Sequence, residues 1–97
     1  MNYQALMKQA QTLQRDMLKT KEEIEKMEFE ETNNLVTVKI NGKKEIVSVK
    51  INADTLEKED IEMVEDMIAL AFNQALKKVD EVTEQKMGKY SSLAGMF

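Results

Sequence analysis

A heptad stripe of mostly apolar side chains constrains the start of this chain to a long helix. The stripe advances in alternating steps of three and four residues: Tyr3, Leu6, Ala10, Leu13, Met17, Thr20, Ile24 and Met27. That spacing aligns the side chains along one edge of a helix, and such an edge packs against a partner helix. We therefore predict a helix from about Tyr3 to Met27, roughly 35–40 Å long. A domain of this size cannot cover so long a helix, so its distal part should project or pair with another helix.

The stripe has two interpretations. In the first, it forms the arm of a dimer, with Leu13, Met17 and Ile24 packed against other helices. In the second, it packs within the same chain, on the last helix or on a sheet. Ala10 and Thr20 weaken the stripe, so a long autonomous coiled coil is not expected. We predict an arm that is partly docked on the rest of the molecule.

The opposite side of this helix is basic. Lys8, Arg15 and Lys19 follow one another in steps of seven and four, and Gln11 and Thr12 fall within the same stripe. One interpretation is a row of phosphate contacts on DNA, with the polar side chains adding hydrogen bonds. The other is the ordinary solvated face of an amphipathic helix, which is a routine feature of globular proteins.

Charge is segregated along a chain that is acidic overall, with a net charge of −4. Residues 1–21 carry four basic and one acidic side chain, whereas residues 22–31 carry six acidic and one basic. Residues 54–66 form a second acidic belt. Because charges more than about 8–10 Å apart are largely screened at physiological salt, a local basic face can act despite the total.

The composition excludes several classes of function. The chain of 97 residues has no cysteine and no histidine, so it lacks thiolate chemistry, the commonest general base and the commonest transition-metal ligand. The acidic belts fit no calcium-loop pattern, and no carboxylate pair marks a general acid and base. We expect no catalytic residue, no metal site, no cofactor and no small-molecule substrate. We see no signal peptide and no apolar run near the ~20 residues that span a bilayer, which predicts a cytoplasmic protein that does not enter membranes.

The middle of the chain changes to the period of a β-strand. Apolar residues alternate with polar ones over 36–40 and again over 46–51, and Asn41-Gly42 between them is a strong hairpin signal. A two-residue loop would pair Val36 with Val47 across this hairpin. A further strand is expected at about Glu28–Thr32, with Asn33-Asn34 as its turn.

A second long helix follows the strands. Asp60 precedes it, and Gly88 is the expected end. Its apolar face is broad from Ile61 to Leu76, so we expect that stretch to be well buried. A second set of basic residues lies near its end, either for DNA contacts or for solubility and the helix dipole: Lys77, Lys78, Lys86 and Lys89.

The resulting fold class is α+β, in the order α-β-β-β-α, with a small antiparallel sheet flanked by two long helices. We assign residues 1–88 to a single domain and expect residues 89–97 to be a flexible tail.

In this order, several segments resemble the YbaB/EbfC family of bacterial nucleoid-associated proteins. Leu6-Met7-Lys8-Gln9-Ala10-Gln11 resembles the opening of that family, and Leu35-Val36-Thr37-Val38-Lys39-Ile40-Asn41-Gly42 resembles its hairpin. Glu62–Ile68 and Ala71–Ala75 resemble its second-helix signature, Lys86-Met87 the end of that helix, and Gly95-Met96-Phe97 its tail. The resemblance covers nearly the whole chain.

Two positions depart from the family pattern. Thr32-Asn33-Asn34 stands where the family has a glycine-rich turn, and asparagine tolerates the left-handed conformation that such a turn needs. Asn52-Ala53 stands where the family often has Asp-Pro.

The resemblance implies a small homodimer with projecting helical arms, located in the nucleoid, that binds duplex DNA and influences nucleoid organisation or gene expression. The candidate DNA contacts are Lys8, Gln11, Arg15 and Lys19, with Lys77, Lys78, Lys86 and Lys89 as the second set. No recognition helix, zinc finger or cluster of base-stacking aromatic residues accompanies them, so readout of base sequence is not predicted. The alternative is a prefoldin-like chaperone or a coiled-coil adaptor without DNA binding.

Overall fold

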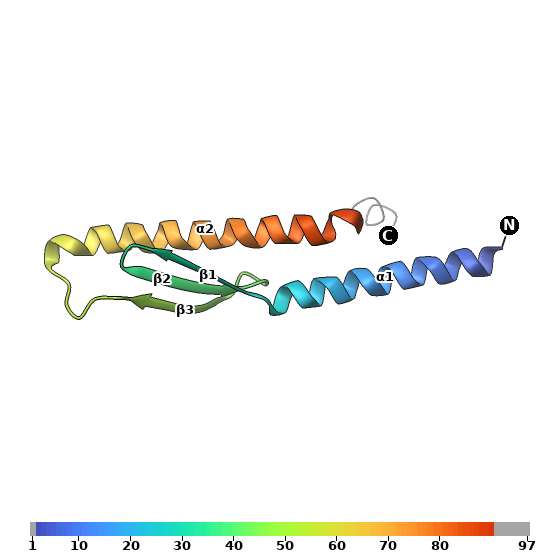
Figure 1. Ribbon diagram of the computed structural model, residues 1–97, viewed down its shortest axis with the longest axis horizontal. Coiled ribbons are helices and arrows are strands. Elements are labelled where there is room, and N and C mark those ends of the chain that lie inside the picture. Colours follow the sequence, from blue (N-terminus) through green and yellow to red (C-terminus); the bar gives the residue numbers. More distant parts are fainter. Residues whose placement is uncertain (1, 91–97) are drawn as a thin grey trace.

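A small antiparallel sheet lies along one long helix, and a second long helix leads away from the end of that sheet (Figure 1). The computed structural model describes residues 2–90. Its elements are α1 (Tyr3–Lys26), β1 (Glu28–Asn33), β2 (Val36–Asn41), β3 (Ile46–Ile51), the short turn η1 (Lys58–Asp60), α2 (Ile61–Met87) and the short turn η2 (Gly88–Tyr90). The predicted α+β class and the order α-β-β-β-α are confirmed.

The first helix begins and ends close to the predicted residues. At its start, the side-chain oxygen of Asn2 accepts a hydrogen bond from the backbone N–H of Ala5 at 3.2 Å, which satisfies one otherwise unpaired donor. At its other end, the backbone becomes extended at Met27. The first half of α1 extends past the end of α2 (Figure 1), as expected for a projecting arm. The radius of gyration is therefore 19.7 Å, against about 12–13 Å for a compact chain of this length.

The turn between β1 and β2 depends on an asparagine in a left-handed conformation. Asn34 has φ 54°, a region that glycine and asparagine adopt at low cost. The strands on either side pair from Glu28 with Asn41 to Asn33 with Val36. The predicted strand is thus confirmed. The turn is formed by Asn34 and Leu35, one residue later than the predicted Asn33-Asn34, because Asn33 still pairs with Val36. An asparagine takes the left-handed position that glycine would take in the turn.

The loop between β2 and β3 is longer than the predicted two residues, so the predicted register is wrong. Val36 pairs with Ile51, and Val38 pairs with Val49. The Asn41 side-chain oxygen accepts hydrogen bonds from the backbone N–H groups of Lys43 and Glu45 at 2.9 and 3.0 Å. Lys44 takes the left-handed conformation, with φ 65°.

Gly42 has a different role from the one that the hairpin signal suggested. Its φ is not positive, so it supplies no left-handed turn position. Instead, the loop lies directly against the end of α1, where the Gly42 N–H donates to the Met27 carbonyl at 3.0 Å. A Cβ at position 42 would lie 1.8 Å from the Ile24 carbonyl oxygen. Glycine is required here because two backbone segments approach closely.

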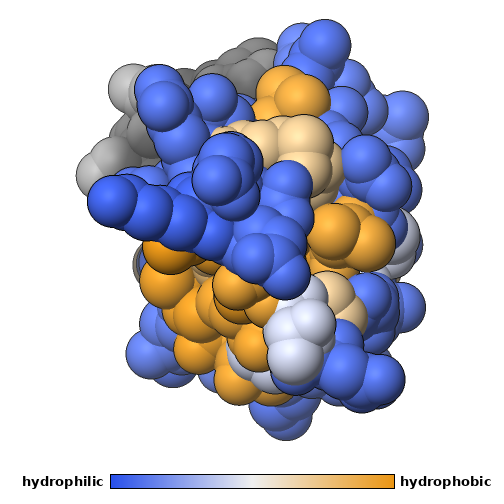
Figure 2. All heavy atoms as spheres, turned by 90° about the vertical axis from the view of Figure 1, so that its left-hand side faces the viewer, coloured by the Kyte–Doolittle hydropathy of each residue, from blue (hydrophilic) through white to orange (hydrophobic). Residues whose placement is uncertain are grey.

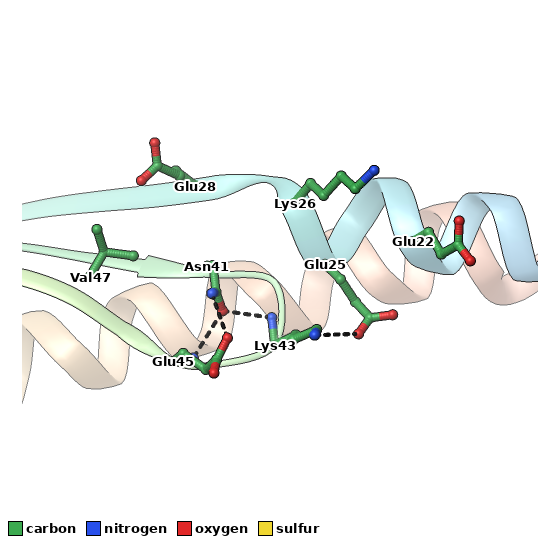
Figure 3. Close-up of a pocket in the computed structure, with 8 residues that line it drawn as sticks. All are labelled: Glu22, Glu25, Lys26, Glu28, Asn41, Lys43, Glu45 and Val47. Carbon is green, nitrogen blue, oxygen red and sulfur yellow. Dashed lines mark hydrogen bonds and ion pairs between the residues drawn. The ribbon is translucent and has the colours of Figure 1, made fainter.

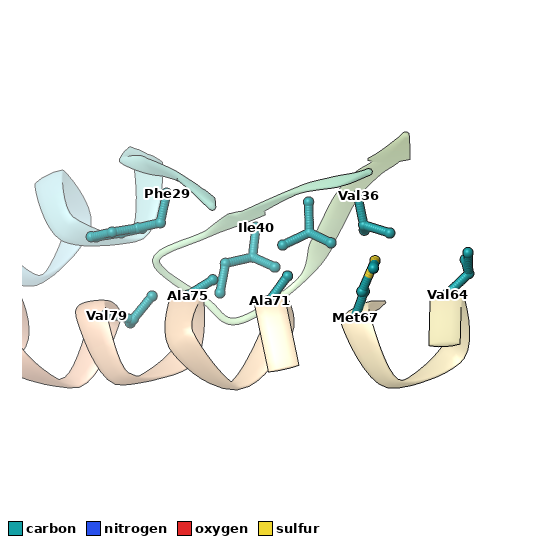
Figure 4. Packing of buried hydrophobic residues seen from close by; sticks show 9 residues of the cluster. Phe29, Val36, Ile40, Val64, Met67, Ala71, Ala75 and Val79 are labelled. Atoms are coloured by element: carbon teal, nitrogen blue, oxygen red, sulfur yellow. The ribbon is translucent and has the colours of Figure 1, made fainter. Parts of the chain in front are cut away.

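The core forms between α2 and the first two strands (Figure 4). Ala71 and Ala75 are fully buried, and their small side chains let the helix approach the sheet closely. They pack in one cluster with the following apolar residues: Phe29, Val36, Val38, Ile40, Val64, Met67 and Val79.

The third strand has no helix over it. Every residue of β3 is exposed, although Val49 and Ile51 pair with the buried Val38 and Val36 on the same side of the sheet. The prediction that α2 is well buried from Ile61 to Leu76 is wrong for the single chain, because Met63 is 43% exposed and Leu70 is 50% exposed. One helix is too narrow to cover three strands, so an apolar face stays open.

Candidate nucleic-acid interface

The structure places the predicted basic residues of α1 together on one exposed face. Lys8, Gln11, Arg15 and Lys19 are all exposed. Lys8 and Lys19 are eleven residues apart, which corresponds to about 17 Å along the helix axis. The apolar stripe lies on the other side of the helix, where Ile24 is buried and Leu13 and Met17 are half-buried. This basic face therefore points away from the side that packs on the molecule.

Electrostatically, the basic face is available to an outside anion. Within residues 2–90, no ion pair involves Lys8, Arg15 or Lys19. The Thr12 hydroxyl donates to the Lys8 carbonyl oxygen at 3.0 Å, so its proton is used within the helix and it can offer a ligand only its oxygen. The three cations are thus the main groups that could bind phosphate here.

An acidic hollow limits the basic face at its C-terminal end (Figure 3). Its walls hold the carboxylates of Glu22, Glu25, Glu28 and Glu45, with only Lys26 and Lys43 as cations. Lys43 lies 3.9 Å from Glu25. A phosphate backbone would be repelled at this end, so the useful part of the face runs from Lys8 to Lys19.

One basic residue on this stripe was not predicted. Lys26 follows Lys19 by seven residues and is exposed, so the same spacing that selected the other three could have found it. Its position in the acidic hollow makes it a poorer phosphate ligand, however, because four glutamates and only one other lysine line that hollow.

The second predicted set does not form a single face. Lys77, Lys78, Lys86 and Lys89 are exposed, but Lys77 and Lys86 are two and a half turns apart and so lie on opposite sides of α2. Lys78 forms an ion pair with Glu31 of β1 at 2.6 Å. Lys89 lies over the Tyr90 ring, 5.1 Å from its centroid. These lysines are therefore scattered, and one of them is already neutralised.

Neither a metal site nor a membrane-spanning helix is found among residues 2–90. In the described part of the chain, no group of three or more acidic, histidine or cysteine side chains is placed to hold a metal ion. No helix among these residues is long and apolar enough to cross a bilayer.

Comparison with known proteins decides the family. Residues 1–96 match the sequence profile of the YbaB/EbfC DNA-binding family. The chain belongs to that family. It is 46% identical to a nucleoid-associated protein of Clostridium novyi, with 100% of this chain and 90% of that protein aligned. It is 43% identical to a nucleoid-associated protein of Lactococcus lactis subsp. cremoris, with 94% of each chain aligned.

The segments that resembled the YbaB/EbfC family lie on distinct elements of the fold. The opening segment, Leu6–Gln11, lies on α1 and contains Lys8 and Gln11 of the basic face. The hairpin segment forms β2 and the start of its loop, and the second-helix signature lies on α2 over the core. The family pattern therefore covers both the residues that build the core and part of the candidate interface.

Proposed function

We propose that this protein binds duplex DNA through the exposed basic face of α1. The observation that carries the proposal is the placement of Lys8, Arg15 and Lys19 on a projecting helix, free of ion pairs within residues 2–90, in a chain of a DNA-binding family. Phosphate contacts by such cations bind without reading base sequence. The protein acts as a nucleoid-associated binding protein and not as an enzyme. It is located in the nucleoid of a bacterial cytoplasm, where it modulates gene expression.

We further propose that it works as a homodimer through the open apolar face. We assign to this face four exposed apolar residues: Val49 and Ile51 of β3, and Met63 and Leu70 of α2. Exposed apolar side chains gather at the end of the molecule where α2 begins (Figure 2). β3 is also an edge strand, and an exposed apolar edge favours pairing with another chain. A second copy would cover both.

The surface area supports this partner. The chain exposes 7448 Å², whereas a compact monomer of its mass exposes roughly 5,700 Å². The excess exceeds the roughly 800 Å² that each partner buries in a standard interface.

A salt-dependent titration of duplex DNA tests the binding proposal. Reversing Lys8, Arg15 and Lys19 to Glu should abolish binding while the dimer stays folded, because phosphate would then meet carboxylates along the whole face. Unchanged affinity in this variant would remove the assigned face. Suppression of client aggregation, with no DNA affinity even at low salt, would instead support the chaperone alternative.

A matched pair of variants separates the face from total charge. Lys8→Glu with Lys19→Glu and Lys50→Glu with Lys58→Glu change the net charge equally, and all four lysines are exposed. Only the first pair should weaken binding strongly. Equal losses in both would mean that overall charge, and not the α1 face, governs affinity.

A further inference from the structure

We propose that residues 91–97 dock on the N-terminal part of the α1 apolar stripe, which is formed by the exposed Leu6 and the half-buried Ala10, Leu13 and Met17. Residues of α1 and α2 already lie side by side in the described part of the chain. The tail that follows α2 would extend this contact along α1 within the same chain. It concerns how the arm is held, so it does not depend on DNA binding.

The first observation is a gradient of burial along the stripe. Ile24 is 3% exposed, Leu13 and Met17 are half-buried, and Leu6 is 49% exposed. The gradient follows the extent of the second helix, because α1 continues beyond the end of η2 (Figure 1). The outer part of the stripe is therefore only partly covered, and Leu6 at its far end is exposed.

The second observation is that the chain leaves the described region next to this stripe. Ile24 of α1 and Thr83 and Met87 of α2 line the same groove, so the two helices lie side by side there. One turn further on, Tyr90 is 5% exposed. The described part of the chain thus ends at a buried anchor just past the groove, on the side of the partly covered stripe.

The third observation is the period of the tail sequence. The side of α2 that faces the groove continues through Thr83, Met87 and Tyr90, in steps of four and three. Leu93 and Phe97 extend the same pattern in steps of three and four. Residues 91–97 have no charged side chain, so burial against an apolar stripe would not desolvate a charged group of the tail.

The seven residues of the tail are long enough to reach along the stripe. Seven residues span about 10 Å as a helix and at most about 23 Å when extended. The stripe from Met17 to Leu6 is about 17 Å long. The tail can therefore place its last apolar side chains between Leu13 and Leu6.

Engineered disulfides test the contact directly, since the chain has no cysteine of its own. Ala10→Cys with Ala94→Cys replaces two small apolar residues, and its control is Thr12→Cys with Ala94→Cys, whose first thiol lies on the basic side of α1. We expect the first pair to form an intrachain disulfide at least ten times faster than the control. Equal rates would overturn the proposal.

Mixing isotopically light and heavy chains before oxidation shows whether the stripe contacts the tail of its own chain, the tail of a second copy or the arm of a second copy. A disulfide that joins light to heavy chains through positions 10 and 94 would show that the tail docks on a second copy. Rapid dimerisation of Ala10→Cys alone would show that the stripe pairs with another arm. Either result would overturn intrachain docking without touching the DNA-binding proposal.

Hydrogen exchange gives a second readout that needs no cross-link. Leu93→Ser with Phe97→Ser should raise the exchange rates of α1 amides between Leu6 and Met17 about tenfold, while the amides of β2 keep their rates. Ser91→Ala with Ser92→Ala is the control and should change neither. Unaltered α1 exchange in the first variant would contradict docking.

Discussion

The environment of Gly42 leaves no room for a side chain. The backbone of the β2–β3 loop meets the last turn of α1 there, and no side chain fits between them. A single residue thus joins the helix that carries the basic face to the sheet that carries the core. The orientation of the arm depends on this approach of two backbones.

Gly42→Ala should lower the free energy of unfolding by about 3 kcal/mol or more, because its Cβ would overlap the Ile24 carbonyl. Gly88→Ala is the matched control. Its Cβ would meet nothing within 4 Å, and its helical backbone should make the change neutral or stabilising by up to about 1 kcal/mol. Urea unfolding at fixed protein concentration measures both. Similar losses in the two variants would contradict the role given to Gly42.

Individual lysines should differ in their contribution to DNA affinity. Lys8→Ala removes a cation with no ion-pair partner among residues 2–90, so in a dimer it should reduce the slope of log affinity against log salt by about 2. Lys78→Ala removes a cation already paired with Glu31, and its slope should change by well under 1. Titrations at four or more salt concentrations give these slopes, and a larger change for Lys78→Ala would move the interface to α2.

At the scale of elements, the sequence predicted what local rules control. The stripe of α1, the alternation of the strands and the boundary of α2 at Gly88 follow from periodicity and caps, and they were confirmed. The predicted β2–β3 register was wrong because the local sequence Asn41-Gly42 is typical of a two-residue turn. The actual loop is set by side-chain bonds from Asn41 and by packing on α1, which no local pattern reports.

Asn41→Ala should destabilise the β2–β3 hairpin. Its side chain accepts from the N–H groups of Lys43 and Glu45 and donates to the Glu45 carboxylate at 2.9 Å, so the loss should be about 1–3 kcal/mol. Asn52→Ala, which gives up one long hydrogen bond of 3.4 Å to Thr37, should cost less than about 0.5 kcal/mol. Thermal unfolding of both variants checks this difference, and equal costs would contradict the loop assignment.

In the candidate site, too, the sequence predicted what local spacing decides and missed what contacts between distant segments decide. The sequence predicted that Lys8, Arg15 and Lys19 share one face, because helical spacing alone decides that. It could not separate Lys78 from the other lysines of α2, since its partner Glu31 lies on a strand distant in sequence. It also placed Met63 and Leu70 in the core, because hydropathy does not distinguish buried apolar residues from apolar residues that stay exposed in the single chain.

At the scale of the whole molecule, the open face of β3 should control assembly. Val49→Asp would place a carboxylate in the proposed dimer interface and should weaken dimerisation at least about 30-fold, or ~2 kcal/mol. Because Val49 is exposed in the single chain, the variant should still fold. Ser48→Asp adds the same charge on the other side of the strand and should leave the dimer intact.

Sedimentation equilibrium gives the dissociation constants, and circular dichroism checks the fold. If Val49→Asp remains dimeric with wild-type affinity, the interface lies elsewhere. If Ser48→Asp dissociates equally, edge pairing of β3 rather than its apolar face holds the two copies together.

The projection of α1 also makes the protein's electrostatics depend on distance from its acidic body. Lys8 lies fourteen residues before Glu22 on the same helix, or about 21 Å along its axis. At physiological ionic strength, charges are screened beyond about 8 Å, so DNA bound at Lys8 as proposed would not sense the acidic belts. At 0.01 M the screening length is about 30 Å, and the belts would then repel the same duplex. In the proposed complex, α1 would thus hold the duplex beyond the reach of the acidic belts at physiological salt. Lowering the ionic strength below that range should give less added affinity than phosphate contacts alone would produce.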